Sequence, residues 1–325
     1  MTRVAVIDVG TVTARLAIAD VADGRVQRMM RQSNIVNLGE GVDQTGVLAD
    51  AACKRLLSCV DGYLAELQQT NAQAVCCTLT SAARDARNSE DLLSALSARG
   101  IRAQVIPGQV EGMLTFLGVA QDFGGERLLV ADNGGGSTEF ALGELTADGT
   151  LQLDFVQSVD VGCRRVTEKY LSRTDPPAQA DLAEAHAFAR AAFGAVVSEH
   201  EASVHDIARM VMTGGTATTL VALHKQLVPY DSSQVHLATL PRDVVRAQEE
   251  RLAALPVAAR AELPGIQAKR APVILGGAVA VSEAMDAFGM HELTVSESDL
   301  LFGLSLTVAA TADGTPSPVG RRPSL

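Results

Sequence analysis

Two glycine turns in this chain each follow a strand-like run that ends in aspartate. The first is Asp8-Val9-Gly10-Thr11, and the second is Asp132-Asn133-Gly134-Gly135-Gly136-Ser137. Glycine lets the backbone come close to a ligand, so that backbone N–H groups can bind phosphate oxygens beside the carboxylate. A carboxylate also suits Mg²⁺, which binds oxygen ligands and phosphate groups. One such turn is common in proteins, but a pair of them indicates a metal–phosphate site.

The segments around the two turns repeat in the same order. The strand-like runs are residues 4–8, 15–19 and 74–79 in the first half and residues 128–132, 138–142 and 207–212 in the second. The third run of each half leads into a threonine-containing turn, at residues 80–84 and 213–217, and then into a segment of helical period. Repetition of this kind predicts two related α/β domains.

The predicted domains are residues 1–123 and 124–310, each of ordinary domain size. Residues 311–325 contain Gly, Pro and Ser and are expected to form a disordered tail. Apolar residues at helical spacing predict four long helices, at residues 49–69, 177–199, 242–255 and 270–288.

Composition excludes several classes of protein. The formal net charge of −11 argues against nucleic-acid binding, which needs a broad basic face. No apolar stretch reaches the roughly 18 residues of a membrane span, and the N-terminus does not resemble a secretory signal, so we expect a cytoplasmic protein without a membrane partner. The five cysteines show no zinc-ligand spacing and are expected to be reduced and mostly buried.

The motifs, taken in order, resemble those of the exopolyphosphatase/guanosine pentaphosphatase (Ppx/GppA) phosphatase family. The resemblance covers about residues 1–305. Besides the two glycine turns and Arg15, the matching segments are Thr80-Ser81-Ala82-Ala83-Arg84, Pro107-Gly108-Gln109-Val110-Glu111-Gly112, Val161-Gly162-Cys163-Arg164-Arg165, Thr213-Gly214-Gly215-Thr216 and, more loosely, Lys269-Arg270-Ala271-Pro272.

This resemblance implies a fold and a site. The fold is α/β, with duplicated actin-like ATPase (ribonuclease H-like) domains and a cleft between them. Glu111 is the implied catalytic base, and Asp132, Glu139 and Asp8 are implied ligands of Mg²⁺, with Mn²⁺ as an alternative. The implied phosphate-binding residues are Gly10, Thr11, Arg15, Arg84, Gly134, Gly135, Gly136, Ser137, Thr138, Gly214, Gly215 and Thr216. A homodimer is also implied.

Three departures from the family pattern bear on substrate preference rather than fold. Val12 stands where the family commonly has Asn, and Gln109-Val110 replaces acidic neighbours of Glu111. Leu301-Phe302 stands where the family commonly has Arg-Glu.

The implied function is a Mg²⁺-dependent exopolyphosphatase that processively removes terminal phosphate from inorganic polyphosphate. Guanosine pentaphosphate is the alternative substrate, but only 3% of residues are aromatic, and nucleobases are usually bound on aromatic surfaces. A catalytically weak protein that binds polyphosphate or an alarmone is a second alternative. A sugar or acetate kinase of the same superfamily is a third, although such kinases use an aspartate base where this chain has Glu111.

Overall fold

Two mixed sheets organise the chain. The computed structural model describes residues 1–321 and 323–325. A five-stranded sheet of order β3-β2-β1-β4-β5 belongs to unit 1, which comprises Met1–Gly125, Leu145–Gln152 and Asp299–Leu325. A six-stranded sheet of order β10-β11-β9-β6-β7-β8 belongs to unit 2, which comprises Glu126–Glu144 and Leu153–Ser298.

The strands begin and end as follows: β1 Thr2–Val9, β2 Thr13–Ala22, β3 Arg25–Ile35, β4 Ala74–Leu79, β5 Ala103–Val105, β6 Leu128–Asn133, β7 Thr138–Leu145, β8 Leu151–Val159, β9 Arg209–Thr213, β10 Ala238–Pro241 and β11 Glu292–Val295. The helices are α1 Val42–Thr45, α2 Asp50–Leu67, α3 Ser81–Asp85, α4 Ser89–Ser97, α5 Gly108–Ala120, α6 Cys163–Val166, α7 Gln179–Glu199, α8 Gly215–Lys225, α9 Ser232–Val235, α10 Arg242–Ala253, α11 Val257–Ala261, α12 Ile274–Ala287 and α13 Leu300–Ala312. A π-helical turn at Thr167–Leu171 and a 3₁₀ turn at Ala268–Arg270 complete the set.

The two sheets share one topology, which confirms the predicted duplication. In unit 1, β1 pairs antiparallel with β2 and parallel with β4. In unit 2, β6 pairs antiparallel with β7 and parallel with β9. The four long helices predicted from apolar spacing are present as α2, α7, α10 and α12, with slightly shorter ends.

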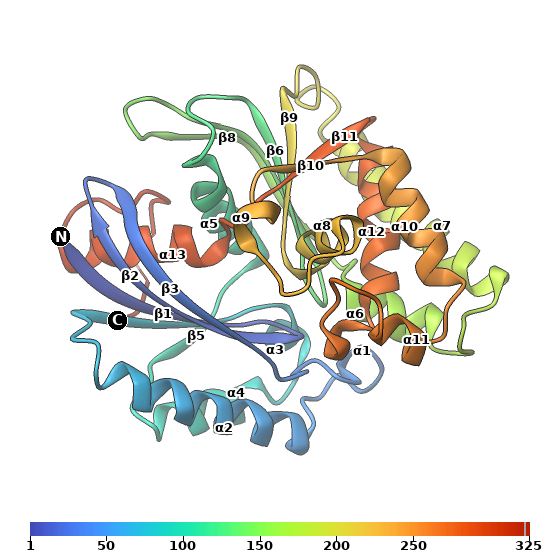
Figure 1. Cartoon of the computed structure of the whole chain (residues 1–325). Coiled ribbons are helices and arrows are strands. Elements are labelled where there is room, and N and C mark those ends of the chain that lie inside the picture. Colours follow the sequence, from blue (N-terminus) through green and yellow to red (C-terminus); the bar gives the residue numbers. More distant parts are fainter. Residues whose placement is uncertain (322) are drawn as a thin grey trace. The chain divides into compact units, whose positions relative to one another are not determined.

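Unit 1 has helices on both faces of its sheet because successive side chains of a strand point to opposite sides. Ala5, Ile7 and Val9 of β1 join the apolar cluster that contains residues of α2 and α4. Val4 and Val6 join a second cluster with residues of α5 and α13. Figure 1 shows α2 and α4 on one side of this sheet and α13 on the other.

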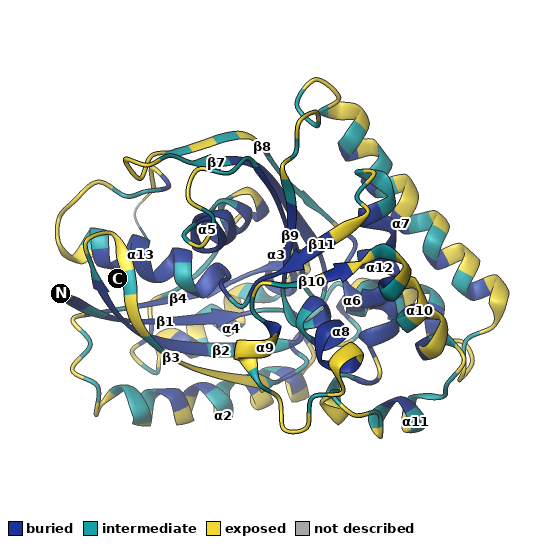
Figure 2. Ribbon diagram, turned by 45° about the horizontal axis from the view of Figure 1, so that its top comes forward, coloured by how far each residue is buried: buried dark blue, intermediate teal, exposed yellow. Residues whose placement is uncertain are grey.

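Burial differs between the centre and the edge of this sheet. Residues of β1 are almost all buried, whereas most residues of β3 are exposed, as the colours of Figure 2 show. β3 is an edge strand and carries Arg25, Arg28 and Arg31. Charged residues on an edge strand oppose pairing with another chain.

α13 crosses α5 at a close approach that two glycines make possible. A Cβ atom at Gly303 of α13 would lie 1.8 Å from the carbonyl oxygen of Leu114. A Cβ atom at Gly118 of α5 would lie 2.2 Å from the carbonyl oxygen of Asp299. Because only glycine fits at both positions, the backbones of the two helices touch, and the start of α13 is held against the sheet of unit 1.

The division into units differs from the predicted boundary between residues 123 and 124. The boundary at 125/126 is close to that expectation, but residues 145–152 and 299–325 also belong to unit 1. The cause is packing, since α13 supplies Leu300, Leu304 and Val308 to the apolar cluster beneath β1. The cleft expected between the domains stays a prediction.

The expected disordered tail at residues 311–325 also differs from the structure, which describes all of it except residue 322. α13 continues to Ala312, and the hydroxyl of Thr2 donates to Oδ1 of Asp313 at 2.7 Å. Val319 is buried in the same cluster as α13. The expectation of disorder came from the composition of the tail, which does not show that Val319 packs into an apolar cluster.

The cysteines agree with the sequence-based expectation. All five are free thiols, and Cys76, Cys77 and Cys163 are buried. Burial raises the pKa of Cys76 to about 12 and raises that of Cys77 as well. Among the described residues, no helix combines the length and apolar character needed to cross a membrane.

His186 of α7 lies between two glutamates of neighbouring helices in unit 2. Its Nδ1 is 2.7 Å from Oε1 of Glu283 in α12, and its Nε2 is 2.7 Å from Oε1 of Glu249 in α10. Hydrogen bonds to Glu249 and Glu283 raise the pKa of His186 to about 9. Both ring nitrogens can donate only when the ring is protonated, so the two carboxylates hold an imidazolium.

We expect this cluster to make the stability of the protein depend on pH. The pKa of His186 rises from 6.5 to about 9 on folding, so its stabilisation is complete below pH about 6.5 and is lost as the pH rises through about 9. Solvent at the partly exposed ring limits the effect to about 1–2 kcal/mol. Urea unfolding of the wild type and of His186→Asn from pH about 6 to about 9.5 measures it.

The gap in unfolding free energy between the wild type and His186→Asn should shrink as the pH rises. His200→Asn is the matched control, because the hydrogen-bond partner of His200 is the uncharged side chain of Gln157. A gap for His186→Asn that stays constant with pH would contradict the prediction.

Candidate active site

The first glycine turn, between β1 and β2, is tied to the segment that follows β3. Gly10 N–H donates to the carbonyl of Thr13 at 2.8 Å, and Gly39 N–H donates to that of Thr11 at 2.8 Å. The carbonyl of Val12 accepts from Val36 N–H at 3.0 Å, and the Val12 side chain is buried. Val12, one of the departures from the family pattern, is therefore a buried apolar residue of the turn.

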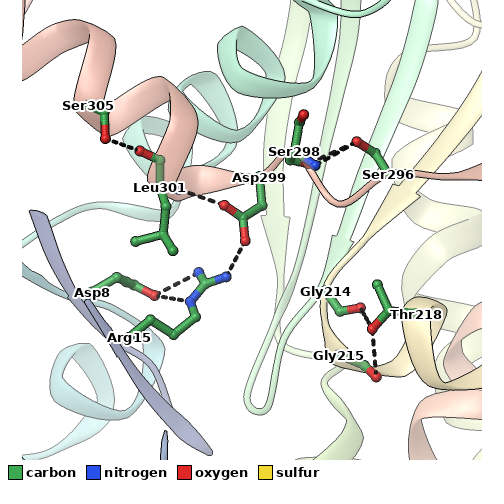
Figure 3. Close-up of polar contacts among 10 residues, drawn as sticks. All are labelled: Asp8, Arg15, Gly214, Gly215, Thr218, Ser296, Ser298, Asp299, Leu301 and Ser305. Carbon is green, nitrogen blue, oxygen red and sulfur yellow. Dashed lines mark hydrogen bonds and ion pairs between the residues drawn. The ribbon is translucent and has the colours of Figure 1, made fainter. Parts of the chain in front are cut away.

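Asp8 and Arg15 face each other in the register of β1 and β2, and Figure 3 shows their contact. Oδ2 of Asp8 accepts from Arg15 Nε at 3.0 Å and from Nη2 at 2.7 Å. Nη1 of Arg15 donates to Oδ2 of Asp299 at 2.5 Å. Burial raises the pKa of the Asp8 carboxyl, and the positive charge of Arg15 opposes that shift. Arg15 thus lies between two carboxylates of unit 1.

Glu111, the predicted base, lies in the first turn of α5 and pairs with Arg84 of α3. Nη1 of Arg84 donates to Oε2 of Glu111 at 2.6 Å and to the carbonyl of Ile106 at 3.0 Å. Only 11% of the Glu111 side chain and 21% of the Arg84 side chain are exposed. Nη1 of Arg84 therefore contacts the carboxylate of the predicted base, and the expected role of Arg84 in phosphate binding stays a prediction.

In unit 2, the carbonyl groups of the triple-glycine turn face the start of α6. The three bonds are Cys163 N–H to Gly134 O at 2.9 Å, Arg164 N–H to Gly135 O at 2.8 Å and Arg165 Nε to Gly136 O at 2.8 Å. In a planar trans peptide the C=O and N–H groups point in opposite directions. The N–H groups of residues 135–137 therefore point away from α6, and successive N–H groups aimed one way form a concavity suited to an anion.

Gly162, directly before α6, lies against this turn. A Cβ atom at Gly162 would be 2.5 Å from the carbonyl carbon of Gly135 and 2.5 Å from that of Gly136. Real side chains do not come that close to backbone atoms, so any larger residue would displace the turn. Gly162 lies within one of the motifs that resemble the family, but its residue type and position in the sequence predicted no role for it.

Side-chain hydrogen bonds fix the turn to the start of α8. Thr216 Oγ1 donates to Oδ1 of Asn133 at 3.1 Å, and Nδ2 of Asn133 donates to Oγ1 of Thr138 at 2.8 Å. Thr138 in turn donates to the carbonyl of Val161 at 2.5 Å. All of these groups are buried, and such satisfied polar networks are rigid. The hydroxyls of Thr138 and Thr216 therefore help to fix the turn, and contact of these two residues with phosphate stays a prediction.

The N-terminus of α8 meets a carboxylate and a guanidinium. Gly214 has φ +95°, and a Cβ atom there would be 2.7 Å from Oδ1 of Asp132. A Cβ atom at Gly215 would be 1.8 Å from Nη1 of Arg270. In Figure 3, the carbonyls of Gly214 and Gly215 accept from the hydroxyl of Thr218, at 3.2 and 3.4 Å. The start of a helix attracts anions, and Arg270 adds positive charge there.

Asp132 and Glu139 occupy facing positions of β6 and β7 and are buried. Oε1 of Glu139 accepts from the hydroxyls of Ser137 and Ser158, both at 2.7 Å. The described residues contain no group of three or more His, Cys, Asp or Glu side chains arranged to hold a metal. Two carboxylates nevertheless fit Mg²⁺, which commonly takes one or two together with water and phosphate oxygens.

The predicted metal ligands are divided between the units, since Asp8 lies in unit 1 and Asp132 and Glu139 lie in unit 2. Oδ1 of Asp8 is buried without a hydrogen-bond partner. Buried polar atoms normally have hydrogen-bond partners. This oxygen is therefore suited to accept a hydrogen bond from a metal-bound water. Sequence reasoning missed Asp299 and did not single out Arg270, and only Arg270 lay within a motif that it quoted.

Comparison with known proteins agrees with this arrangement. The model of the Ppx/GppA phosphatase family matches residues 17–308. Exopolyphosphatase 2 of Mycobacterium tuberculosis is 36% identical over 327 residues, covering 95% of this chain and 99% of that protein. Exopolyphosphatase 1 of Mycobacterium bovis is 30% identical over 319 residues, covering 96% of this chain and 90% of that protein.

A solved structure from the same family also resembles this chain. The crystal structure of the Aquifex aeolicus member of the Ppx/GppA family has a TM-score of 0.77 and 28% identity, covering 94% of this chain and 96% of that chain. The repeated sheet topology of units 1 and 2 matches the duplicated domains of the actin-like ATPase fold. The fold class expected from the motifs is confirmed.

Proposed function

Because this chain belongs to the Ppx/GppA phosphatase family, we propose that it is an exopolyphosphatase that processively removes terminal phosphate from inorganic polyphosphate with Mg²⁺. Family membership makes it a hydrolase of phosphoanhydride bonds. The observation that carries the proposal is the triple-glycine turn of unit 2. Its carbonyls are bound to α6, so its N–H groups point away together, and Asp132 and Glu139 flank it.

Glu111 is the proposed base, which takes the proton of the attacking water. Its pairing with Arg84 leaves the carboxylate in one orientation, which favours a positioned water over a mobile one. Phosphoryl transfer needs mainly positioning and charge neutralisation from the protein. A single oriented carboxylate together with cationic and N–H groups meets that need.

The phosphate groups are proposed to bind to the N–H groups of residues 135–137 and to the start of α8 at Gly214 and Gly215. Arg270 and Arg15 add positive charge in units 2 and 1, respectively. Asp132 and Glu139, with Asp8 as a further oxygen ligand, would hold Mg²⁺ or alternatively Mn²⁺. That ion would neutralise phosphate charge.

Guanosine pentaphosphate is the second candidate substrate, on the ground of family membership. Its base would need a stacking surface, and the chain has no Trp and only 3% aromatic residues. Three of the ring contacts lie within unit 2 between partly or fully buried rings, such as Phe140 with Phe193. We therefore favour polyphosphate.

A phosphate-release screen tests the proposal. The purified protein is incubated with long polyphosphate, short polyphosphate, guanosine pentaphosphate and ATP, with Mg²⁺, with Mn²⁺ and with a chelator. We expect phosphate release from polyphosphate to be fastest, to depend on the metal and to leave no intermediate chain lengths on a gel. A clear preference for guanosine pentaphosphate would favour the second candidate, and tight binding without release would favour a binding protein.

Two further expectations stay predictions. A homodimer is expected from the family resemblance, and light scattering on the purified protein measures it. A cytoplasmic location is expected from the sequence, and cell fractionation checks it.

A further inference from the structure

Asp299 uses each of its two carboxylate oxygens for a different purpose. Oδ1 accepts from the backbone N–H of Leu301 at 2.9 Å and so caps the N-terminus of α13. Oδ2 accepts from Nη1 of Arg15 at 2.5 Å. Figure 3 shows both contacts, with Asp299 between the helix and the arginine. The side chain is 8% exposed, so solvent weakens neither contact strongly.

Asp8 and Asp299 divide the guanidinium of Arg15 between them. Asp8 binds Nε and Nη2 with one oxygen, and this two-point contact fixes the plane of the guanidinium. Asp299 binds Nη1. Each terminal nitrogen of the guanidinium carries two N–H groups. A phosphate that engages Nη1 must share that nitrogen with the negatively charged carboxylate of Asp299.

We propose that Asp299 competes with phosphate oxygens for Nη1 of Arg15 and thereby lowers the affinity of the enzyme for polyphosphate. The inference rests on the proposed role of Arg15 in phosphate binding. It explains why the carboxylate of Asp299 lies beside Arg15, a cation that is expected to bind a polyanion. A processive enzyme that must move a highly charged chain forward after each cleavage gains from such a limit on affinity, because tight ground-state binding does not raise kcat.

Asp299→Asn separates the two roles of the side chain. Asparagine has one acceptor oxygen, and it caps helices about as well as aspartate. When that oxygen accepts from Leu301 N–H, the amide NH₂ faces Nη1 of Arg15, and two donors cannot bond. The cap is then kept while the competition for Arg15 is lost.

The experiment measures the dissociation constant of tripolyphosphate by titration calorimetry for the wild type, Asp299→Asn, Arg15→Gln and the double variant. We expect Asp299→Asn to bind roughly tenfold more tightly, which is about 1.4 kcal/mol, and to lower KM without a gain in kcat. Asp231→Asn is the matched control, because Asp231 caps α9 by accepting from Ser233 N–H at 3.0 Å, and its other side-chain hydrogen bonds within the described residues are with the side chains of Ser233 and Gln234.

The double variant decides whether Asp299 acts through Arg15. In the Arg15→Gln background, Asp299→Asn should give no gain in affinity. Unchanged or weaker binding in Asp299→Asn, or a gain that persists without Arg15, overturns the inference.

The two proposals fail in different ways. Polyphosphate turnover by the wild type, with no tightening in Asp299→Asn, overturns this inference and leaves the proposed function standing. Tighter tripolyphosphate binding by Asp299→Asn, in a protein that releases no phosphate, supports this inference and overturns the proposed function. Absence of tripolyphosphate binding in every variant overturns both.

Discussion

Glu111→Gln is expected to lower kcat by about 10²–10⁴-fold, the usual contribution of a general base, with tripolyphosphate binding close to that of the wild type. Glutamine has nearly the same size and can still accept a hydrogen bond from Arg84, whose Nη1 lies 2.6 Å from Oε2 of Glu111. It cannot take a proton from water. The loss should therefore appear in turnover rather than in binding.

Steady-state kinetics and calorimetry on the same preparation measure both quantities. Glu40→Gln is the matched control, because Glu40 also pairs with an arginine of unit 1, Arg55, at 2.9 Å, but lies on the surface. Asp132→Asn serves as a second comparison and should weaken the dependence of activity on Mg²⁺. A wild-type kcat in Glu111→Gln would rule out Glu111 as the base, and Glu139 would be the next candidate.

Gly162→Ala is expected to lower kcat/KM for polyphosphate by about 10²-fold, because a displacement of about 1 Å in a binding group can cost that much. The added methyl group would lie 2.5 Å from backbone atoms of Gly135 and Gly136. The triple-glycine turn must then move away from α6. Its hydrogen bonds to Cys163 and Arg164 would lengthen, and its N–H groups would lose their common direction.

Gly194→Ala provides the control for this substitution. Gly194 lies within α7 of the same unit, and a Cβ atom there meets nothing within 4 Å. This variant should keep its activity and gain up to about 1 kcal/mol of stability, since alanine favours helix over glycine. Comparable activity of Gly162→Ala and Gly194→Ala, both folded by circular dichroism, would show that the turn does not bind the substrate.

Much of the fold follows from local patterns. Strands β1, β2, β6 and β7 follow from short apolar runs joined by glycine turns, and the repeat of these runs predicts duplicated domains. The helix α2 follows from apolar residues at helical spacing. Such patterns can be recognised in a sequence because they involve residues that are close together in the chain. For the same reason, a short hairpin is enough to place Asp132 and Glu139 opposite each other.

Ion pairing of the candidate residues depended on contacts that no local pattern contains. The sequence indicates that Arg84 and Glu111 are chemically suited to a site, but their pairing joins residues of α3 and α5 that are 27 positions apart in the chain. A local motif predicts which groups are present, whereas their partners are set by how helices pack.

The sequence by itself determined the two glycine turns, the duplicated strands and the family, because each is written in a continuous segment. Only the tertiary structure decided that α13 belongs to unit 1 and that Asp299 pairs with Arg15, from which it is separated by 284 positions. That pairing requires α13 to lie against α5, where Gly118 and Gly303 allow their backbones to touch. Contacts between such distant segments depend on how the surfaces of the folded chain pack against each other. Residue type and spacing along the sequence do not specify that packing.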